Sequence, residues 1–194
     1  MEKTAPKGAR RSKATSKDAS PSATSSSPPF VILGVDPGLR VTGWGIVGVQ
    51  DGALFSPAFG AIPTQAKHPP EQRLLHIFQE LCGVIGRWRP AEVAVEDPFV
   101  GENVRSAFAV GAARAVALLA AAHAGLAVSP YAPAEVKLAV TGYGRSDKAQ
   151  IQELVRVQLG MVEAPESQDA ADALGVALCH HMKKVEAARL ERAL

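Results

Sequence analysis

The stretch VILGVDPG, residues 31–38, decides the fold of this chain. An apolar run leads to Asp36, and Pro37-Gly38 closes it, which is the pattern of a short buried strand that stops at a turn. A carboxylate at the mouth of a buried strand is costly unless it is paired or bound to a cation. Asp36 is therefore the first candidate for a functional side chain.

The residues after this turn predict an antiparallel meander. The run VTGWGIVGV, residues 41–49, has the bulky spacing of a second strand, and Asp51-Gly52 is typical of a hairpin turn. ALFSPAFGAIP, residues 53–63, would be the returning strand. The apolar spacing within residues 71–88 then predicts a helix, which Pro90 would stop.

The second half of the chain alternates short strands with helices. AEVAVE (91–96) and LAVSPY (126–131) predict strands, and Asn103 would cap a long apolar helix that Gly125 ends, placed in the core or in a subunit interface. Further helices are predicted near residues 134–140, 147–159 and 168–185. We therefore expect an α/β fold: a mixed sheet of three antiparallel strands followed by parallel strands, with helices on both faces.

Three further carboxylates stand where a solvated acid is not expected. Glu96 ends the apolar run Val93-Ala-Val95, and Asp169 and Asp172 lie three residues apart on the last predicted helix, which Ser167 would cap. Four converging carboxylates could hold two Mg²⁺ or Mn²⁺ ions roughly 4 Å apart, the arrangement that activates water for phosphodiester cleavage.

Each of these acids also has an ordinary structural explanation. Asp36 could be a turn acid, Asp169 could favour the helix dipole, and Glu96 could solubilise an edge, where Asp97 competes for its role. Asp172 is harder to explain, because aspartate is a poor residue inside a helix with apolar neighbours. All four together favour a metal site.

Charge and composition separate a tail from the fold. Residues 1–29 are rich in Ser, Pro and Lys, lack apolar periodicity and predict a disordered tail with six basic and two acidic residues. The remainder, a domain of residues 30–188 and a C-terminal end at 189–194, holds 15 basic and 17 acidic residues. Any nucleic-acid surface on it must therefore come from clustered basic groups.

The setting that we expect is the cytoplasm. The tail has no apolar core of a secretory signal, and Arg114 and His123 interrupt the longest apolar stretch, which argues against a membrane span. Cys82 and Cys179 lie far apart, so a disulfide framework is not expected. Lone histidines, His123, His180 and His181, are more often structural than metal ligands.

Four motifs in order resemble the RuvC Holliday-junction resolvases. They are VILGVDPGLRVTGWGIV (31–47), VAVEDPFVGENVRSAFAVGAARAVA (93–117), APAEVKLAVTGYGRSDKAQIQELV (132–155) and DAADALGVALCHH (169–181). The resemblance implies a ribonuclease-H-like fold and a homodimeric, divalent-metal-dependent endonuclease that nicks four-way DNA junctions in recombination and repair. It places the family's four catalytic and metal-binding acids at Asp36, Glu96, Asp169 and Asp172.

The resemblance also suggests contacts to DNA. Phe99 matches a phenylalanine that stacks on a base, and Lys137 and Lys148 match lysines that approach phosphate, with Arg145 a possible addition. Arg114 matches a family arginine but could equally satisfy helix carbonyls at an interface. The branch-migration complex bound to the junction is a partner that the family implies.

Three rival functions share parts of this pattern. Sugar kinases and actin-like ATPases have the Asp-Pro-Gly turn, but they need a second repeated domain that 194 residues do not supply. A catalytically silent junction-binding protein would lack one of the four acids. A nuclease of the same fold that cuts structured RNA is the remaining alternative.

Overall fold

A computed structural model describes residues 28–97, 104–142 and 148–193 of the chain. Most of the predicted tail, the cap at Asn103, and the candidates Phe99 and Arg145 lie outside the described residues, as does the side chain of Lys148.

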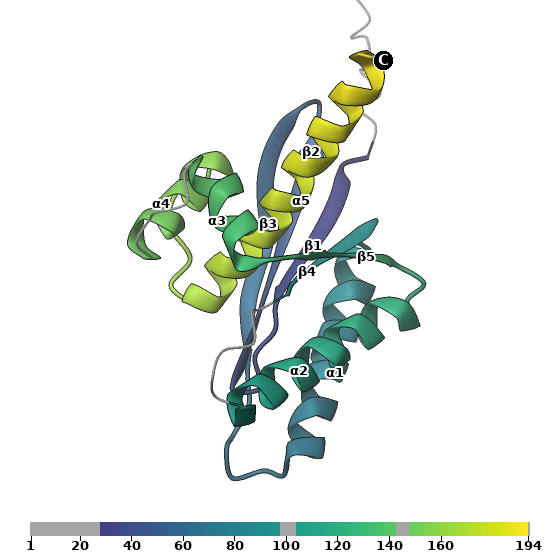
Figure 1. Cartoon of the computed structure of the whole chain (residues 1–194), viewed down its shortest axis with the longest axis vertical. Helices are drawn as coiled ribbons and strands as arrows, with labels where there is room; N and C mark the ends of the chain where they lie inside the picture. Colours follow the sequence, from purple (N-terminus) through teal and green to yellow (C-terminus); the bar gives the residue numbers. More distant parts are fainter. Residues whose placement is uncertain (1–27, 98–103, 143–147, 194) are drawn as a thin grey trace, which may run out of the picture.

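The five strands form one mixed sheet in the order β3-β2-β1-β4-β5 (Figure 1). Strands β1 (Phe30–Asp36), β2 (Val41–Gln50) and β3 (Ala53–Pro63) are antiparallel neighbours, while β4 (Glu92–Glu96) and β5 (Ala127–Tyr131) extend the sheet in parallel from β1. Asp51 and Gly52 both have positive φ, at 52° and 81°, as a two-residue hairpin turn of type I′ requires. The predicted meander and mixed sheet are confirmed.

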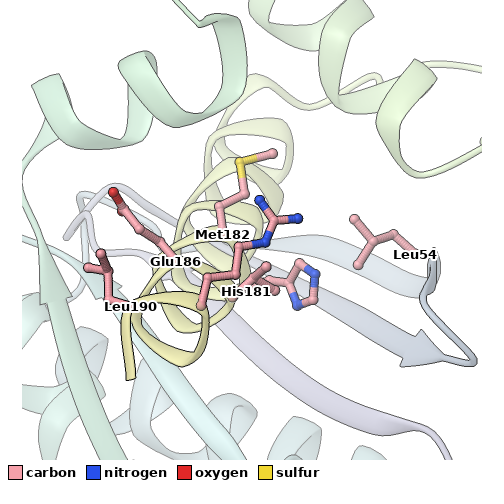
Figure 2. Close-up of a pocket in the computed structure, with 7 residues that line it drawn as sticks. Leu54, His181, Met182, Glu186 and Leu190 are labelled. Carbon is pink, nitrogen blue, oxygen red and sulfur yellow. The ribbon is translucent and has the colours of Figure 1, made fainter. Parts of the chain in front are cut away.

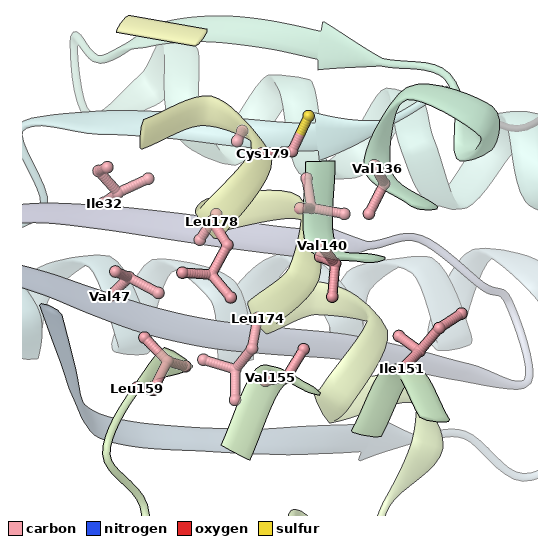
Figure 3. Packing of buried hydrophobic residues seen from close by; sticks show 13 residues of the cluster. Ile32, Val47, Val136, Val140, Ile151, Val155, Leu159, Leu174, Leu178 and Cys179 are labelled. Carbon is pink, nitrogen blue, oxygen red and sulfur yellow. The ribbon is translucent and has the colours of Figure 1, made fainter. Parts of the chain in front are cut away.

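Helices cover both faces of this sheet, as predicted. Helices α1 (Pro70–Trp88) and α2 (Val104–His123) pack on one face, and α3 (Pro133–Thr141), α4 (Lys148–Gln158) and α5 (Gln168–Ala193) lie on the other (Figure 1). Because the side chains of a strand alternate between the two faces of the sheet, the central strands contribute residues to the hydrophobic core on each face. Figure 3 shows the α5 side, where the buried residues include Ile32, Val47, Val136, Val140, Ile151, Val155, Leu159, Leu174, Leu178 and Cys179.

Helix α2 is buried along one side only. Its fully covered residues are alanines, whereas Val104, Phe108 and Leu119 are 65%, 75% and 57% exposed. By length and composition this helix is apolar enough to cross a membrane, so the expectation that Arg114 and His123 exclude a span on those criteria is wrong. The two arginines of this helix do not offset so many apolar residues, although core helices of soluble proteins pass the same test.

Helix α5 runs eight residues past the end predicted at Val185, through the boundary placed after residue 188. Residues 186–193 are exposed, so no apolar periodicity marked them in the sequence. Their composition of Glu, Ala, Arg and Leu has high intrinsic helix propensity, and an ion pair between Lys183 and Glu186 adds to it.

Glycines let α5 lie directly on the sheet. A Cβ added at Gly34 would stand 2.0 Å from the carbonyl oxygen of Ala173, and one at Gly43 would stand 1.9 Å from that of Asp169. Gly34 lies on β1 and Gly43 on β2, on the face that carries α5. The absence of these two side chains fixes how closely the helix, and with it Asp169, approaches the strands.

We predict that Gly43→Ala lowers thermal stability, because its methyl group must displace the first turn of α5. The same displacement moves Asp169, so the variant should also slow the phosphodiester cleavage that the sequence predicts. The matched control is Gly83→Ala in exposed α1, where an added Cβ meets nothing within 4 Å. Alanine is favoured over glycine within a helix by about 1 kcal/mol, so the control should melt higher. Equal melting temperatures for the two variants would contradict this account of the sheet–helix contact.

Candidate active site

The ends of two parallel strands bring Asp36 and Glu96 together. Val35 of β1 is in register with Val95 of β4, so the two acids that come next leave the sheet at the same edge. Both positions continue the alternation that faces α5, since Gly34 contacts that helix and Ala94 belongs to its core. The predicted placement of these acids at adjacent strand ends is confirmed.

The first turns of α5 carry the other two acids over the same edge. The Ser167 hydroxyl accepts a hydrogen bond from the amide of Ala170 at 3.4 Å, in agreement with the predicted N-cap. Asp169 rests through its backbone on Gly43, which is the register partner of Asp36 in the β1–β2 pair. Asp172 lies one helical turn further on.

Glu96 and Asp172 line one small hollow with Lys137 of α3, about 230 Å³ in volume. Burial, together with repulsion from Asp172, raises the pKa of Glu96 to about 7, while the positive charge of Lys137 acts in the opposite direction. Two carboxylates share a part-buried space with one exposed ammonium. Burial and the repulsion between the two carboxylates therefore disfavour the ionised form of Glu96.

Asp169 lines a neighbouring hollow, with the turn after β1 and the beginnings of α1 and α2. Among the described residues, no three His, Cys, Asp or Glu side chains stand in an arrangement that could hold a metal ion. The backbone thus gathers all four acids at one edge without closing their side chains into a shell. Repulsion between like charges in a part-buried space opposes such closure.

The alternation of the strand directs Glu96 and Asp97 to opposite faces of the sheet. Asp97 points away from the hollow to Arg114 of α2, whose Nε lies 3.0 Å from its Oδ1. The contact is an ion pair without the direction of a hydrogen bond, since Arg114 Nε is buried and has no hydrogen-bond partner. Arg114 therefore ties α2 to the end of β4, a role that neither of its two predicted explanations included.

A set of polar contacts, which we call the lock, holds α5 to β4 and β5, and sequence reasoning missed it. His180 is 4% exposed; its Nε2 lies 2.5 Å from Glu92 Oε2, and its Nδ1 lies 2.8 Å from the Tyr131 hydroxyl. Lys184 donates to the other oxygen of Glu92, and this bond, with that from His180, holds the pKa of Glu92 below its ordinary value. The structural interpretation of His180 is confirmed.

The sequence pattern places one member of this lock, Glu92 on its strand, but not the partners on α5. Glu92 and Glu96 lie four residues apart on one strand and therefore face the same side. Glu92 begins the strand beside the middle of α5, and Glu96 ends it beside Asp172. The lock thus fixes the spacing between β4 and α5, and with it the approach of Glu96 to Asp172.

Of the predicted DNA contacts, Lys137 lines the hollow that contains Glu96 and Asp172, whereas Arg114 pairs with Asp97. Lys148 begins α4. The DNA-binding roles assigned to Phe99, Lys137, Arg145, Lys148 and Arg114 all stay predictions.

A third hollow, lined by Leu54 and the outer half of α5, lies away from these acids (Figure 2). Met182, Val185 and Leu190 make it largely apolar, and burial lowers the pKa of His181, which also lines it. It contains none of the four candidate acids and is separate from the site.

The donor set at the sheet edge suits a hard divalent cation. Its four acids offer only carboxylate oxygens, which Mg²⁺ and Mn²⁺ prefer, and no thiolate lies among them. The raised pKa of Glu96 shows that this hollow opposes the ionised carboxylate, an energetic cost that a bound cation offsets. The residues present therefore fit the metal that the sequence predicts.

Comparisons with known proteins point to one family. The family model described as "Crossover junction endodeoxyribonuclease RuvC" matches residues 32–180. Proteins of that name from Heliobacterium modesticaldum and Chloroflexus aurantiacus are each 50% identical over 77% and 76% of this chain, and over 93% and 90% of their own length.

Solved structures show the same fold. The Thermus thermophilus RuvC in complex with Holliday junction substrate has a TM-score of 0.76 and 35% identity, covering 80% of this chain and 94% of that one. A yeast mitochondrial Holliday junction resolvase, Ydc2, shares the fold alone, with a TM-score of 0.57 at 11% identity. The expected ribonuclease-H-like fold is confirmed, and the alternative of an RNA-cutting nuclease gains no support.

We predict that Glu96→Gln stabilises the metal-free protein at pH 8 and has little effect near pH 4.5. The folded pKa, about 7, exceeds the ordinary 4.5, so wild type loses stability as pH rises between these values. The neutral variant escapes that loss and should melt about 2–4 °C higher for each kcal/mol regained.

Two additions sharpen this melting experiment. Mg²⁺ at pH 8 should stabilise wild type and so narrow its difference in melting temperature from Glu96→Gln. Glu80→Gln, at an exposed position on α1, is the matched control for replacing one glutamate by glutamine. If the melting temperatures of Glu96→Gln and wild type differ by the same amount at every pH from 4.5 to 8, the raised pKa of Glu96 is contradicted.

Proposed function

This chain belongs to the RuvC family of crossover junction endodeoxyribonucleases, and we propose that it resolves four-way DNA junctions by metal-dependent hydrolysis of phosphodiester bonds. The observation that carries the proposal is the meeting of β1, β4 and α5 at one sheet edge, where Glu96 and Asp172 share a hollow beside Asp36. No other described hollow combines strand-end carboxylates with a lysine.

The four acids supply the carboxylates that would bind the metal ions of the reaction. Two Mg²⁺ or Mn²⁺ ions bound by Asp36, Glu96, Asp169 and Asp172 would polarise the scissile phosphate and lower the pKa of the attacking water. Asp36 and Glu96 supply carboxylates from the rigid sheet, and Asp169 and Asp172 supply them from the facing helix. Carboxylates on regular elements are held more accurately than carboxylates on loops.

Basic side chains around this edge would bind the DNA backbone. Lys137 stands across the hollow from Glu96, where its ammonium can donate to a non-bridging oxygen of a phosphate. We assign the same class of contact to Lys148, Arg145 and Arg114, and we assign stacking on a junction base to Phe99. Arg114 would act while paired with Asp97, which places its charge beside the strand that carries Glu96.

The exposed face of α2 supports a homodimer. Its outward residues are spaced by three and four along one side and are all apolar or small: Val104, Phe108, Gly111, Ala115, Leu119 and Ala122. Such a face is costly in water, and a second copy of the chain covers it with the same surface by twofold symmetry. Two sites related by a twofold axis match the symmetry of a four-way junction.

The remaining assignments rest on the family. We propose a cytoplasmic location, with which two free cysteines agree, and an encounter with the branch-migration complex bound to the same junction.

We predict that Asp36→Asn, Glu96→Gln and Asp172→Asn each abolish nicking of a synthetic four-way junction while junction binding is largely retained. Metal-binding carboxylates stabilise the charged transition state, whereas binding draws on separate basic groups. The measurements are gel-resolved nicking with Mg²⁺ or Mn²⁺ and fluorescence anisotropy without metal.

The matched control for these amide variants is Asp51→Asn. Asp51 is an exposed acid in the β2–β3 turn, at the opposite end of the hairpin from the site, and asparagine tolerates its positive φ. It should nick at the wild-type rate. Nicking by any of the three site variants at that rate would remove its acid from the proposed metal site.

We predict that Leu119→Glu converts the dimer to a monomer without unfolding it, because a charge is introduced into the apolar face of α2. Light scattering after size exclusion measures the mass, and circular dichroism checks the fold. Val162→Glu, at a loop residue 93% exposed, is the control and should remain dimeric. A dimer that persists in Leu119→Glu at micromolar concentration would place the interface elsewhere.

A further inference from the structure

The hollow that Asp169 shares with the turn after β1 has a strongly basic wall. It measures about 350 Å³ and is lined by Arg40 of the turn, Arg73 of α1 and Ser106 of α2, among others. We call it the arginine hollow. Neither arginine belongs to the basic residues that the motifs identified, yet both stand beside a candidate ligand of the metal.

Arg73 is fixed in place by neutral acceptors. Its Nε donates to the Thr64 hydroxyl at 2.8 Å, and its Nη2 donates to the carbonyl oxygen of Leu39 at 3.0 Å. These bonds orient the guanidinium without neutralising it, and neither Arg73 nor Arg40 forms an ion pair with a carboxylate among the described residues. The positive charge of both therefore remains available to an anion.

The turn that carries Arg40 is itself held firmly. Thr64 donates through its amide to the carbonyl oxygen of Arg40 at 2.8 Å and through its hydroxyl to that of Leu39 at 2.5 Å. The buried Thr42 hydroxyl closes the other side by donating to Gly38 at 2.8 Å. Arg40 is thus an exposed side chain on a rigid base, four residues after Asp36.

We propose that the arginine hollow binds a backbone phosphate of the DNA strand being cut, next to the scissile one. Guanidinium groups match the oxygens of a phosphate, so the wall formed by Arg40 and Arg73 is suited to a phosphodiester. A strand whose scissile phosphate lies at the carboxylates must continue past Asp169 on one side. There Arg40 and Arg73 hold the strand in register with the metal site.

This inference rests on the proposed function, and Arg40→Gln tests it without disturbing the bonds that Arg73 makes. Anisotropy of a labelled four-way junction is measured without divalent metal over a series of salt concentrations. Loss of one phosphate contact should reduce the slope of log K against log salt by about 0.9. Arg192→Gln, the same change near the far end of α5, is the matched control and should keep the wild-type slope.

A junction with a neutral methylphosphonate at single positions around the cleavage site then identifies the phosphate. At one position next to the scissile phosphate, the methylphosphonate should weaken the binding of the junction to wild type. At that position it should cause no further loss of affinity in Arg40→Gln, which already lacks the contact. Arg73→Lys, which keeps the charge, should bind more tightly than Arg73→Gln if both melt at similar temperatures.

The outcomes separate this inference from the function beneath it. If wild type neither binds nor nicks the junction, the proposed function fails and the phosphate contact fails with it. If wild type is active but Arg40→Gln keeps the slope of Arg192→Gln, the arginine hollow is not a phosphate site. The inference is also overturned if every methylphosphonate position lowers the affinity of wild type and of Arg40→Gln by the same factor.

Discussion

The close approach of α5 to the sheet is the contact on which the site depends. Gly34 and Gly43 leave room for backbone atoms of Ala173 and Asp169 to lie where a Cβ would stand. Any side chain there would lift the helix and carry Asp169 and Asp172 away from the strand ends. The carboxylates are therefore positioned by the absence of two side chains as much as by the strands that end in Asp36 and Glu96.

The same contact creates an electrostatic cost. Burial of Glu96, together with repulsion from Asp172, raises the pKa of Glu96 to about 7, so the apolar packing of α5 works against an electrostatic cost at its N-terminal end. The lock of Glu92, His180 and Lys184 holds the helix on the same strand, at the opposite end of β4 from the repulsive pair. A divalent cation offsets the repulsion, and its binding energy is then coupled to the geometry that catalysis needs.

Local pattern in the sequence was enough to locate the four acids. Asp36 and Glu96 each end an apolar run, so their place at the mouths of strands could be predicted directly, and parallel pairing then put them at one edge. Asp169 and Asp172 were identifiable because acids in an alanine-rich helix are costly. The lock around His180 and the basic wall at Arg40 and Arg73 could not be identified in this way. His180 lies 88 residues from Glu92, and Arg73 lies 34 residues from Leu39, so these partners meet only in the folded sheet.

Arg114 shows why a motif match leaves a role open. Its position in the sequence is equally compatible with DNA, with helix carbonyls and with a carboxylate, and only the fold brings Asp97 within 3.0 Å of it. The pairing has a consequence for the site, because Asp97 directly follows Glu96 and points to the opposite face of the strand. By holding Asp97 on the α2 side, Arg114 keeps Glu96 on the α5 side. Helix α2, whose outer face we assign to the dimer, is thus linked through one ion pair to the orientation of Glu96, a carboxylate that we propose binds metal.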